Sequence, residues 1–303
     1  MLLIHSKLRK VAGGVKVFRL ASMRHFATIT VIGRDKTGVI ARVTNFLFEQ
    51  HANIEALEEQ VTRGQFSMTL QASWPKKNFD ASKVRDGLAG LGTLLGMEIK
   101  VRFADPGHRQ RFAIFVTKEP RCFEAIAKAA ASRAFKADPA IVIGNYASFE
   151  PLAKQYKLPF VCVPWEDRAK AELKVLKLLE EQEIDFVVLA RFMKILSPNF
   201  VWRYKNKIIN VHPSLLPSFP GPQAYRQAYE YGVKIAGCTA HFVNMHLDEG
   251  PIIAQGSFRI RPGMTLRQIV ETGQKLEAQV LLKGLKRYLS KQLDVYWGKV
   301  NDV

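Results

Sequence analysis

The chain of 303 residues is long enough for one large and one small domain, and its 48% hydrophobic and 24% charged residues are typical of a soluble globular protein. No run approaches the roughly 18 apolar residues of a membrane helix, and three scattered cysteines without a CxxC pair favour neither a disulfide framework nor a zinc site. The net charge of +18 favours attraction of anionic ligands, but no RNA-binding signature accompanies it, so neither nucleic acid nor a membrane is an expected partner.

Residues 1–24 carry six basic side chains and no acidic one, a composition also found in mitochondrial transit peptides. Met23 directly precedes the first convincing strand, which favours an upstream start site or a disordered extension. Residues 1–24 are therefore predicted to be a disordered extension and the protein to be cytoplasmic, with mitochondrial targeting as the alternative.

Residues 25–105 show strand and helix patterns in the order βαββαβ, which is that of a ferredoxin-like sandwich. Apolar residues along one face indicate a helix over 39–50, and two extended runs around Arg63-Gly64 indicate a hairpin. The other predicted elements are a strand over 25–33, a helix near 80–94 and a strand over 97–103.

After a polar segment at 106–111, residues 110–300 alternate short apolar runs with amphipathic helical patterns. Near-continuous apolar strands suit a parallel sheet that is covered by helices on both faces. Ligands of such open sheets bind beyond the carboxyl ends of the strands. The predicted strands are five parallel ones, RFAIFVT, PAIVIGN, PFVCVP, IDFVVLA and KIINVH, and two antiparallel ones, AGCTAHFV and GPIIAQGSFRI, before a final helix near 266–290.

The segment IINVHPSLLP, over residues 208–217, is the most informative part of the sequence. Asn210 and His212 stand two residues apart at the end of a predicted strand, so their side chains point to the same side, and two prolines then fix a turn. Asp248 follows 36 residues after His212, in HLDEGPIIAQG. An amide, an imidazole and a carboxylate together are sufficient to polarise a carbonyl group and to move a proton at neutral pH.

Each of these residues also has a purely structural interpretation. A lone histidine at a strand end is more often a packing residue, Asp248 can cap a turn, and Thr239 and His241 can hydrogen-bond within the core. LARFMKILSPNF, over 189–200, can be a packed connection or one wall of a pocket for a flat aromatic ligand. The spacing is not that of zinc ligands, so no metal site is predicted, whereas the grouping favours a catalytic site.

Four segments together resemble the formyltransferase domain of enzymes that use 10-formyltetrahydrofolate: IINVHPSLLPSFPG, GCTAHFV, LDEGPIIAQ and LARFMKILSP. GRDKTGVIARVTNFLFEQHANIEAL resembles an ACT domain, and this order of domains is that of the formyltetrahydrofolate deformylase family. The resemblance covers about residues 25–300. It implies an α/β protein with a ferredoxin-like ACT domain over 25–105 and a Rossmann-like formyltransferase domain with a mostly parallel sheet over 110–300.

Two absences favour water as the acceptor of the formyl group. Glycinamide ribonucleotide formyltransferase holds a phosphate in a glycine-rich loop, where this chain reads VTKEPRCFEAI over 116–126. Methionyl-tRNA formyltransferase carries a C-terminal RNA-binding barrel, for which no room is expected here. The resemblance therefore implies a hydrolase that converts 10-formyltetrahydrofolate to formate and tetrahydrofolate for one-carbon and purine metabolism.

The resemblance also implies roles for particular residues. Asn210 and His212 are expected to stabilise the formyl oxygen, and Asp248 to orient His212 or to take a proton from water. No permanently bound cofactor is expected, because the folate is the substrate. The residues expected to contact the folate are Arg191, Phe192, Met193, Leu196, Thr239, His241 and Asn244.

In the ACT block, Asp35, Gly38, Asn53 and Ile54 match effector-binding positions, with glycine or methionine as the candidate effector. ACT domains pair edge to edge, which implies a homo-oligomer, and a purely dimerising domain is the alternative. For the whole protein, the alternatives are a formyltransferase with an unidentified amine acceptor and a non-catalytic folate or amino-acid sensor.

Overall fold

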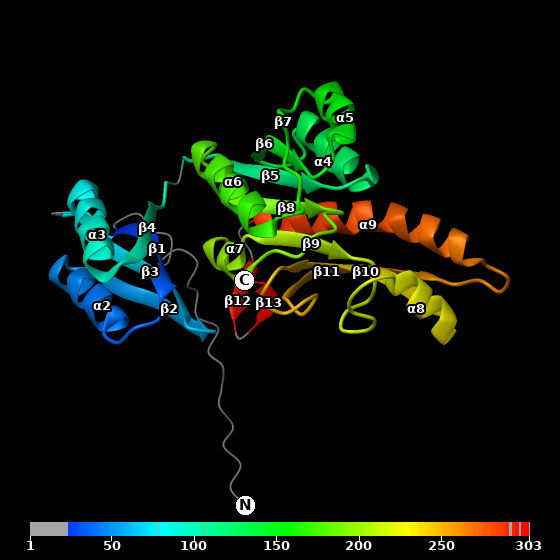
Figure 1. Ribbon diagram of the computed structural model, residues 1–303. Helices are drawn as coiled ribbons and strands as arrows, with labels where there is room; N and C mark the ends of the chain where they lie inside the picture. The colour runs from blue at the N-terminus through cyan, green and yellow to red at the C-terminus, as the bar shows by residue number, and fades with distance from the viewer. Residues whose placement is uncertain (1–23, 78, 106, 291–292, 297, 303) are drawn as a thin grey trace, which may run out of the picture. The chain divides into compact units, whose positions relative to one another are not determined.

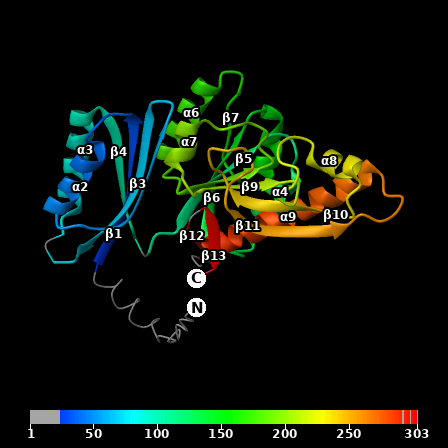
Figure 2. The same cartoon turned by 90° about the horizontal axis from the view of Figure 1, so that it is seen from below.

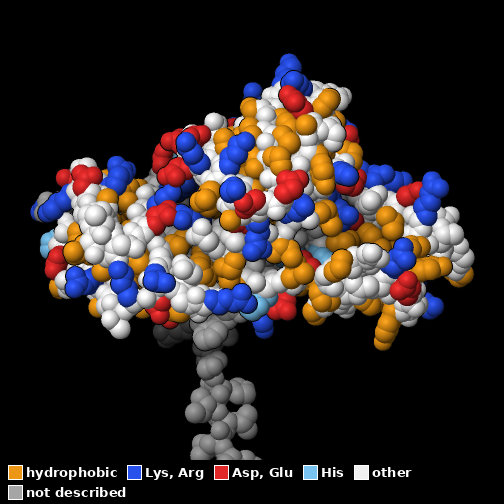
Figure 3. Space-filling view, viewed as in Figure 1, with side chains coloured by type: hydrophobic (Ala, Val, Ile, Leu, Met, Phe, Trp, Pro, Cys, Tyr) orange, Lys and Arg blue, Asp and Glu red, His pale blue; other side chains and the backbone are white. Residues whose placement is uncertain are grey.

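The computed structural model describes residues 24–77, 79–105, 107–290, 293–296 and 298–302 (Figure 1). Residues 1–23 of the predicted disordered extension lie outside the described residues. The chain divides into two compact units, Met1–Gly107 and His108–Val303. Among the described residues, no helix is both long enough and apolar enough to cross a bilayer. Basic and acidic side chains are interspersed on the face drawn in Figure 3.

The first unit is an antiparallel sheet with two helices on one face (Figures 1 and 2). Its elements are β1 (Arg24–Arg34), α2 (Val39–Glu49), β2 (Asn53–Thr62), β3 (Gln65–Pro75), α3 (Ala81–Leu95) and β4 (Met97–Phe103). The four strands described here have the order β2-β3-β1-β4, with every pair antiparallel. The predicted ferredoxin-like βαββαβ order is therefore confirmed.

Periodic apolar residues explain how the two layers of the first unit meet. In α2, Val39, Val43 and Leu47 recur at helical spacing and are buried, and each such side chain contributes about 1.5–3 kcal/mol on burial. In β1, Ile29 and Val31 alternate with the half-buried Thr28 and Thr30 and face the same core. Among the described residues of this unit, no helix covers the other face of the sheet.

The second unit is a layered α/β structure. Its first elements are β5 (Gln110–Val116), α4 (Arg121–Ala131), β6 (Ala137–Gly144), a short 3-10 helix (Ala147–Phe149), α5 (Glu150–Gln155), β7 (Phe160–Cys162), α6 (Arg168–Glu181) and β8 (Phe186–Ala190). They are followed by α7 (Pro198–Arg203), β9 (Ile208–His212), α8 (Ala224–Tyr231), β10 (Ile235–Phe242), β11 (Ile252–Arg259), α9 (Leu266–Leu289), β12 (Leu293–Tyr296) and β13 (Lys299–Asp302).

The central sheet of the second unit has, among the described residues, the strand order β11-β10-β9-β8-β5-β6-β7. The five strands from β5 to β9 pair in parallel, and β10 and β11 pair antiparallel, as the sequence predicts. The hairpin of β12 and β13 was not anticipated, because its strands are short and carry no strong alternation. The mostly parallel Rossmann-like sheet is therefore confirmed.

Helices cover both faces of this sheet. Apolar residues of α4, α5 and α9 form one core with alternate residues of the strands, and those of α6 and α7 form the other. Within β8, Val188 and Ala190 belong to the first core, whereas Val187 and Leu189 belong to the second. Since β5, β8 and β9 are parallel neighbours, their carboxyl ends meet at one edge, where ligands of open sheets bind.

Candidate active site

Four polar side chains from two strands and a loop converge at the carboxyl end of β9. His212 Nδ1 lies 3.2 Å from Asp248 Oδ2, and His241 Nε2 lies 3.9 Å from Asp248 Oδ1. Asn210 Nδ2 lies 3.3 Å from His241 Nε2. The cause is the antiparallel register of β9 and β10, which places Asn210 opposite His241. The three predicted catalytic residues therefore lie together, with His241 as a fourth member.

His212 is buried, and both of its ring nitrogens face oxygen acceptors. Nδ1 faces the Asp248 carboxylate, and Nε2 lies 3.0 Å from the carbonyl oxygen of Phe219. A neutral imidazole donates one hydrogen bond, whereas an imidazolium donates two. The surroundings of His212 therefore suit a ring that carries or hands over a proton.

His241 is held as a neutral ring. Burial lowers the pKa of His241, against the opposing effects of the Phe242 carbonyl and the Asp248 charge. Its Nδ1 atom lies 2.8 Å from the Phe242 carbonyl oxygen and donates to it, so Nε2 is an acceptor for the Asn210 amide. This contact fixes the orientation of the Asn210 amide and leaves its second N–H available for another acceptor.

Asp248 is kept ionised by its loop. Burial acts to raise the pKa of Asp248, but hydrogen bonds from His212 and from the Gly221 amide, 2.9 Å away, outweigh it and lower the pKa. Its backbone has a φ of +58°, in the left-handed region that Asp tolerates better than most residues. Gly250 fixes the loop against β10, because a Cβ there would overlap the carbonyl oxygen of Phe242.

Thr239, on β10, holds the loop after His212 through hydrogen bonds. The fully buried Thr239 hydroxyl donates to the Ser214 carbonyl at 2.7 Å and accepts from the Leu216 amide and from Gln255 Nε2, each at 3.0 Å. One donor and two lone pairs are the whole capacity of a hydroxyl, so none remains for a substrate. The Thr239 hydroxyl therefore holds the loop that carries Phe219, and its hydrogen-bonding capacity is used within the protein.

The segment after β8 presents two apolar side chains to solvent and buries the others. Met193 and Ile195 are each 61% exposed, and the Met193 amide donates to the Thr117 hydroxyl at 3.0 Å. Phe192 and Leu196 are buried in the α6 core. Of the predicted folate contacts, Met193 is thus accessible and Phe192 and Leu196 are buried, while Ile195, which the sequence analysis does not single out, is as exposed as Met193.

Two further predicted folate contacts have internal partners. The Asn244 side chain donates to the Glu249 carbonyl at 3.2 Å and accepts from the His246 amide at 3.0 Å, so it shapes the loop before Asp248. Arg191 Nη1 lies 3.0 Å from Oε2 of the buried Glu277 in α9. Sequence reasoning missed Glu277, although an acidic residue four positions from Gly273 and Leu281, on the buried stripe of α9, is a detectable anomaly.

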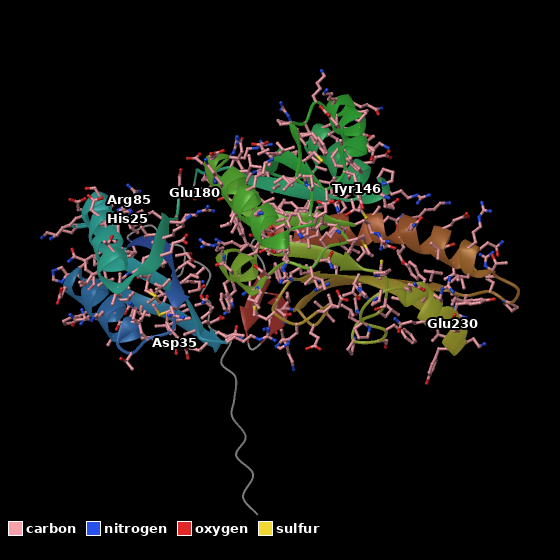
Figure 4. The ribbon with its side chains drawn as sticks, viewed as in Figure 1. His25, Asp35, Arg85, Tyr146, Glu180 and Glu230 are labelled. Carbon is pink, nitrogen blue, oxygen red and sulfur yellow. The ribbon has the colours of Figure 1, made fainter. Side chains whose placement is uncertain are left out.

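The predicted effector residues are all exposed but lie at two ends of the first unit. Asp35, drawn in Figure 4, follows β1, and its amide donates to the Gly64 carbonyl at 2.9 Å, while Gly38 begins α2 with a φ of +83°. Asn53 starts β2 opposite Ser73, next to Ile54, at the other end of the sheet. One copy of the unit therefore does not bring the four residues together.

Comparisons with known proteins assign both units to families. The formyl transferase family model matches residues 110–285, and the ACT domain model matches residues 25–102. The formyltetrahydrofolate deformylase of Escherichia coli (strain K12) is 37% identical over 266 residues, which cover 86% of this chain and 92% of the relative. That of Bacillus subtilis (strain 168) is 33% identical over 270 residues, or 88% and 89% of the two chains. A crystal structure of a formyltetrahydrofolate deformylase from Pseudomonas syringae pv. tomato str. DC3000 matches with a TM-score of 0.63 at 28% identity, covering 95% of this chain and 97% of that one.

Proposed function

The chain belongs to the formyltetrahydrofolate deformylase family, and we propose that it hydrolyses 10-formyltetrahydrofolate to formate and tetrahydrofolate. The observation that supports this most is the group formed by the Asn210 amide, the His212 imidazole and the Asp248 carboxylate at the carboxyl end of β9. Hydrolysis of a formamide needs a hydrogen-bond donor to the formyl oxygen and a group that transfers a proton from water to the leaving nitrogen. The products, formate and tetrahydrofolate, both feed one-carbon metabolism.

Asn210 and His212 are the proposed donors to the formyl oxygen. When water adds to the formyl carbon, negative charge develops on that oxygen. The second N–H of the Asn210 amide can donate a hydrogen bond to the formyl oxygen. The His212 Nε2–H can do the same if it leaves the Phe219 carbonyl oxygen. Removing one such donor typically costs about 3 kcal/mol of barrier.

Asp248 and His212 are the proposed path for the proton. The lowered pKa keeps Asp248 ionised at neutral pH, where it orients the His212 ring and stabilises the imidazolium form. The new C–O bond forms with the oxygen of water, the C–N10 bond breaks, and one proton of the water ends on N10. The second proton is released when the formic acid ionises.

The folate is proposed to lie against the segment after β8. Met193 and Ile195 offer exposed apolar surface for a flat ring, with Phe192 fixed behind them by edge contact with Trp165, ring centroids 5.0 Å apart. The loop that contains Asn244 is proposed to meet the pteridine edge with its backbone. The net charge of +18 favours approach of a negatively charged polyglutamate tail.

The first unit is proposed to bind glycine or methionine between two copies of the chain. The strand β2 pairs with β3 on one side, and its outer edge is unpaired among the described residues of the unit. If β2 pairs antiparallel with β2 of a second copy, Asn53 of one copy approaches the Thr62 end of the other, where Asp35 lies. Such pairing would join the two halves of the effector site and would make the protein a homo-oligomer.

The test is an incubation of the wild-type protein with 10-formyltetrahydrofolate and no amine. We expect formate and tetrahydrofolate to appear in equal amounts over many turnovers. Turnover that requires an added amine would instead favour a formyltransferase, and tight folate binding without turnover would favour a sensor.

A further inference from the structure

The segment that is proposed to face the folate is held at two points by side chains from other elements. Residues 191–197, which connect β8 to α7, are called the β8–α7 segment below. Near its start, the Met193 amide donates to the Thr117 hydroxyl at 3.0 Å. At its end, the Ser197 amide donates to Oε1 of Glu172 at 2.6 Å. Neither Thr117 nor Glu172 has a role in the proposed transfer of the proton.

Glu172 is an unusual residue at its place in α6. The other buried residues of this helix are Ala171, Val175 and Leu179, so the carboxyl group lies in an otherwise apolar stripe. Removing a carboxyl group from water costs free energy unless new hydrogen bonds replace those that are lost. A buried acid in this position therefore indicates a specific partner, and the Ser197 amide is such a partner.

Ser197 needs an acceptor from outside its own helix. It is the N-cap of α7, and its hydroxyl accepts from the Phe200 amide at 3.3 Å. In a capping box, a Glu or Gln three residues after the N-cap accepts from the N-cap amide in return. Here that place is taken by Phe200, which has no side-chain acceptor, and Glu172 of the neighbouring helix α6 supplies the carboxylate instead (Figures 1 and 2). One side chain thus fixes both the end of the β8–α7 segment and the start of α7.

Thr117 fixes the segment from the other side, through the sheet. Val116 pairs with Ala190 in the parallel register of β5 and β8, so Thr117 directly follows its strand next to the start of the segment. Its hydroxyl is buried and accepts from the Met193 amide. The backbone of the segment is therefore held where it leaves β8.

The residues between these two points present the apolar surface. Met193 and Ile195 are exposed, whereas Phe192 and Leu196 are buried in the α6 core. Which side chains face solvent depends on the path of the backbone, and the two hydrogen bonds determine that path. A surface that already has its bound conformation loses less conformational freedom when a ligand binds.

We propose that Thr117 and Glu172 are positioning residues for folate binding, which hold the β8–α7 segment so that Met193 and Ile195 form a preformed surface for the flat ring. The inference rests on the proposed deformylase function. Both residues act through the backbone of the segment, by the hydrogen bonds to Met193 and Ser197. They therefore set the affinity for the folate, while the rate of the bond-making step depends on the separate group around Asp248.

The test uses two variants that remove one acceptor each, Thr117→Val and Glu172→Met. Both keep the approximate size of the side chain and leave one backbone amide without its partner. Thr117→Ser and Glu172→Gln keep an acceptor oxygen and are the rescue variants. The matched controls are Thr272→Val, whose hydroxyl bonds within α9 at 2.8 Å, and Glu181→Met, which removes the exposed partner of Lys177 on α6.

For each protein, kcat and KM for formate release from 10-formyltetrahydrofolate are measured, together with the Kd of tetrahydrofolate by calorimetry. In Thr117→Val and Glu172→Met, we expect KM and Kd to rise about tenfold while kcat stays within about twofold of the wild type, because the lost interaction acts equally before and during the reaction. The rescue variants and the controls should keep nearly the wild-type values.

A purely structural role would lower Tm without moving KM or Kd. Folded Thr117→Val and Glu172→Met proteins with wild-type KM and Kd would overturn this inference and leave the deformylase function standing, as would a fall in kcat at unchanged KM. If Glu172→Met does not fold, Thr117→Val decides, because it changes only one hydroxyl at the end of β5. A wild type that binds tetrahydrofolate but releases no formate would contradict the function itself, and the comparison of Kd values would still test the positioning.

Discussion

At the scale of single residues, the amide of Asn210 has one N–H engaged by His241 and one available for the formyl oxygen. Asn210→Ala removes both, so we expect kcat for formate release to fall about a hundredfold, with a smaller effect on KM, since the charge on the oxygen develops after binding. Asn199→Ala, on the neighbouring helix α7, is the matched control. A variant at residue 210 with normal kcat would show that Asn210 is a packing residue.

His241 makes the stability of the protein depend on pH. Burial lowers the pKa of His241 in the folded chain, whereas the unfolded chain takes up this proton near pH 6.5. As pH falls below about 6.5, the unfolded state therefore binds more protons than the folded state, and folding loses stability. The stabilising contribution is fully present above that pH.

His241→Asn removes this titration. Between pH 7.5 and 5, on the order of two to three pH units, we expect the Tm of the variant to fall less steeply than that of the wild type. His246→Asn, at an exposed position of the neighbouring loop, serves as the control for the loss of an imidazole. Parallel Tm curves for wild type and His241→Asn would rule out this linkage.

The sequence predicts some of these residues better than others. Asn210 and His212 could be found because residues two apart in a strand point to the same side of the sheet. Asp248 could be found because it lies in a turn next to a recognisable strand pattern. The direction of the Arg191 side chain could not, because it depends on a left-handed φ that breaks the alternation of β8. For Thr239, the sequence shows a hydroxyl on a strand beside the proposed site. It does not show whether that hydroxyl faces a ligand or bonds to a neighbouring loop.

At the scale of elements, the strand β10 supports the catalytic loop through one hydroxyl. Thr239→Val keeps the shape but leaves the Ser214 carbonyl and the Leu216 amide without their partner, at a cost of about 1–3 kcal/mol for each buried group. We expect a lower Tm and slower formate release. Thr239→Ser, which keeps the hydroxyl, should restore most of both.

Thr272→Val is the matched control for this change. Its hydroxyl bonds to the Gln268 carbonyl of its own helix at 2.8 Å, on the exposed side of α9. We expect its Tm to stay close to that of the wild type. Equal losses in the variants at 239 and 272 would mean that the loop does not depend on Thr239.

Elements with a strong period were predictable, and those set by tertiary contacts were not. The helix α2 and the strands β5 and β8 carry clear apolar patterns and lie where the sequence places them. The strands β12 and β13 have four residues each and carry no period that distinguishes them from a loop. Short elements of this kind are stabilised by what they pack against, which a local pattern does not contain.

At the scale of the whole molecule, the first unit is expected to bind an amino acid and the second to respond to it. We expect glycine or methionine to bind to the full chain in calorimetry and to change the rate of formate release. Asp35→Ala should weaken that binding, with Asp86→Ala on α3 as the control. Absence of binding by both amino acids would favour a purely dimerising first unit.

The division into two units could be predicted from the sequence because a polar segment at 106–111 separates two blocks with different patterns of apolar residues. The proposed pairing of chains is implied only by the resemblance to ACT domains, because the proposed effector residues lie at opposite ends of one sheet. An oligomer interface leaves no periodic signal in a single sequence.

The central claim is that Asp248, through His212, drives hydrolysis of the formyl group, and acceptor-free formate release tests it most directly. The carboxylate lies 3.2 Å from the imidazole, and Asp248→Asn keeps the shape but removes the charge that supports the proton path. The account predicts steady formate release by the wild type and by the neighbouring control Glu249→Gln, and a loss of at least about a hundredfold in kcat for Asp248→Asn. Formate release by a folded Asp248→Asn protein at the wild-type rate would contradict it.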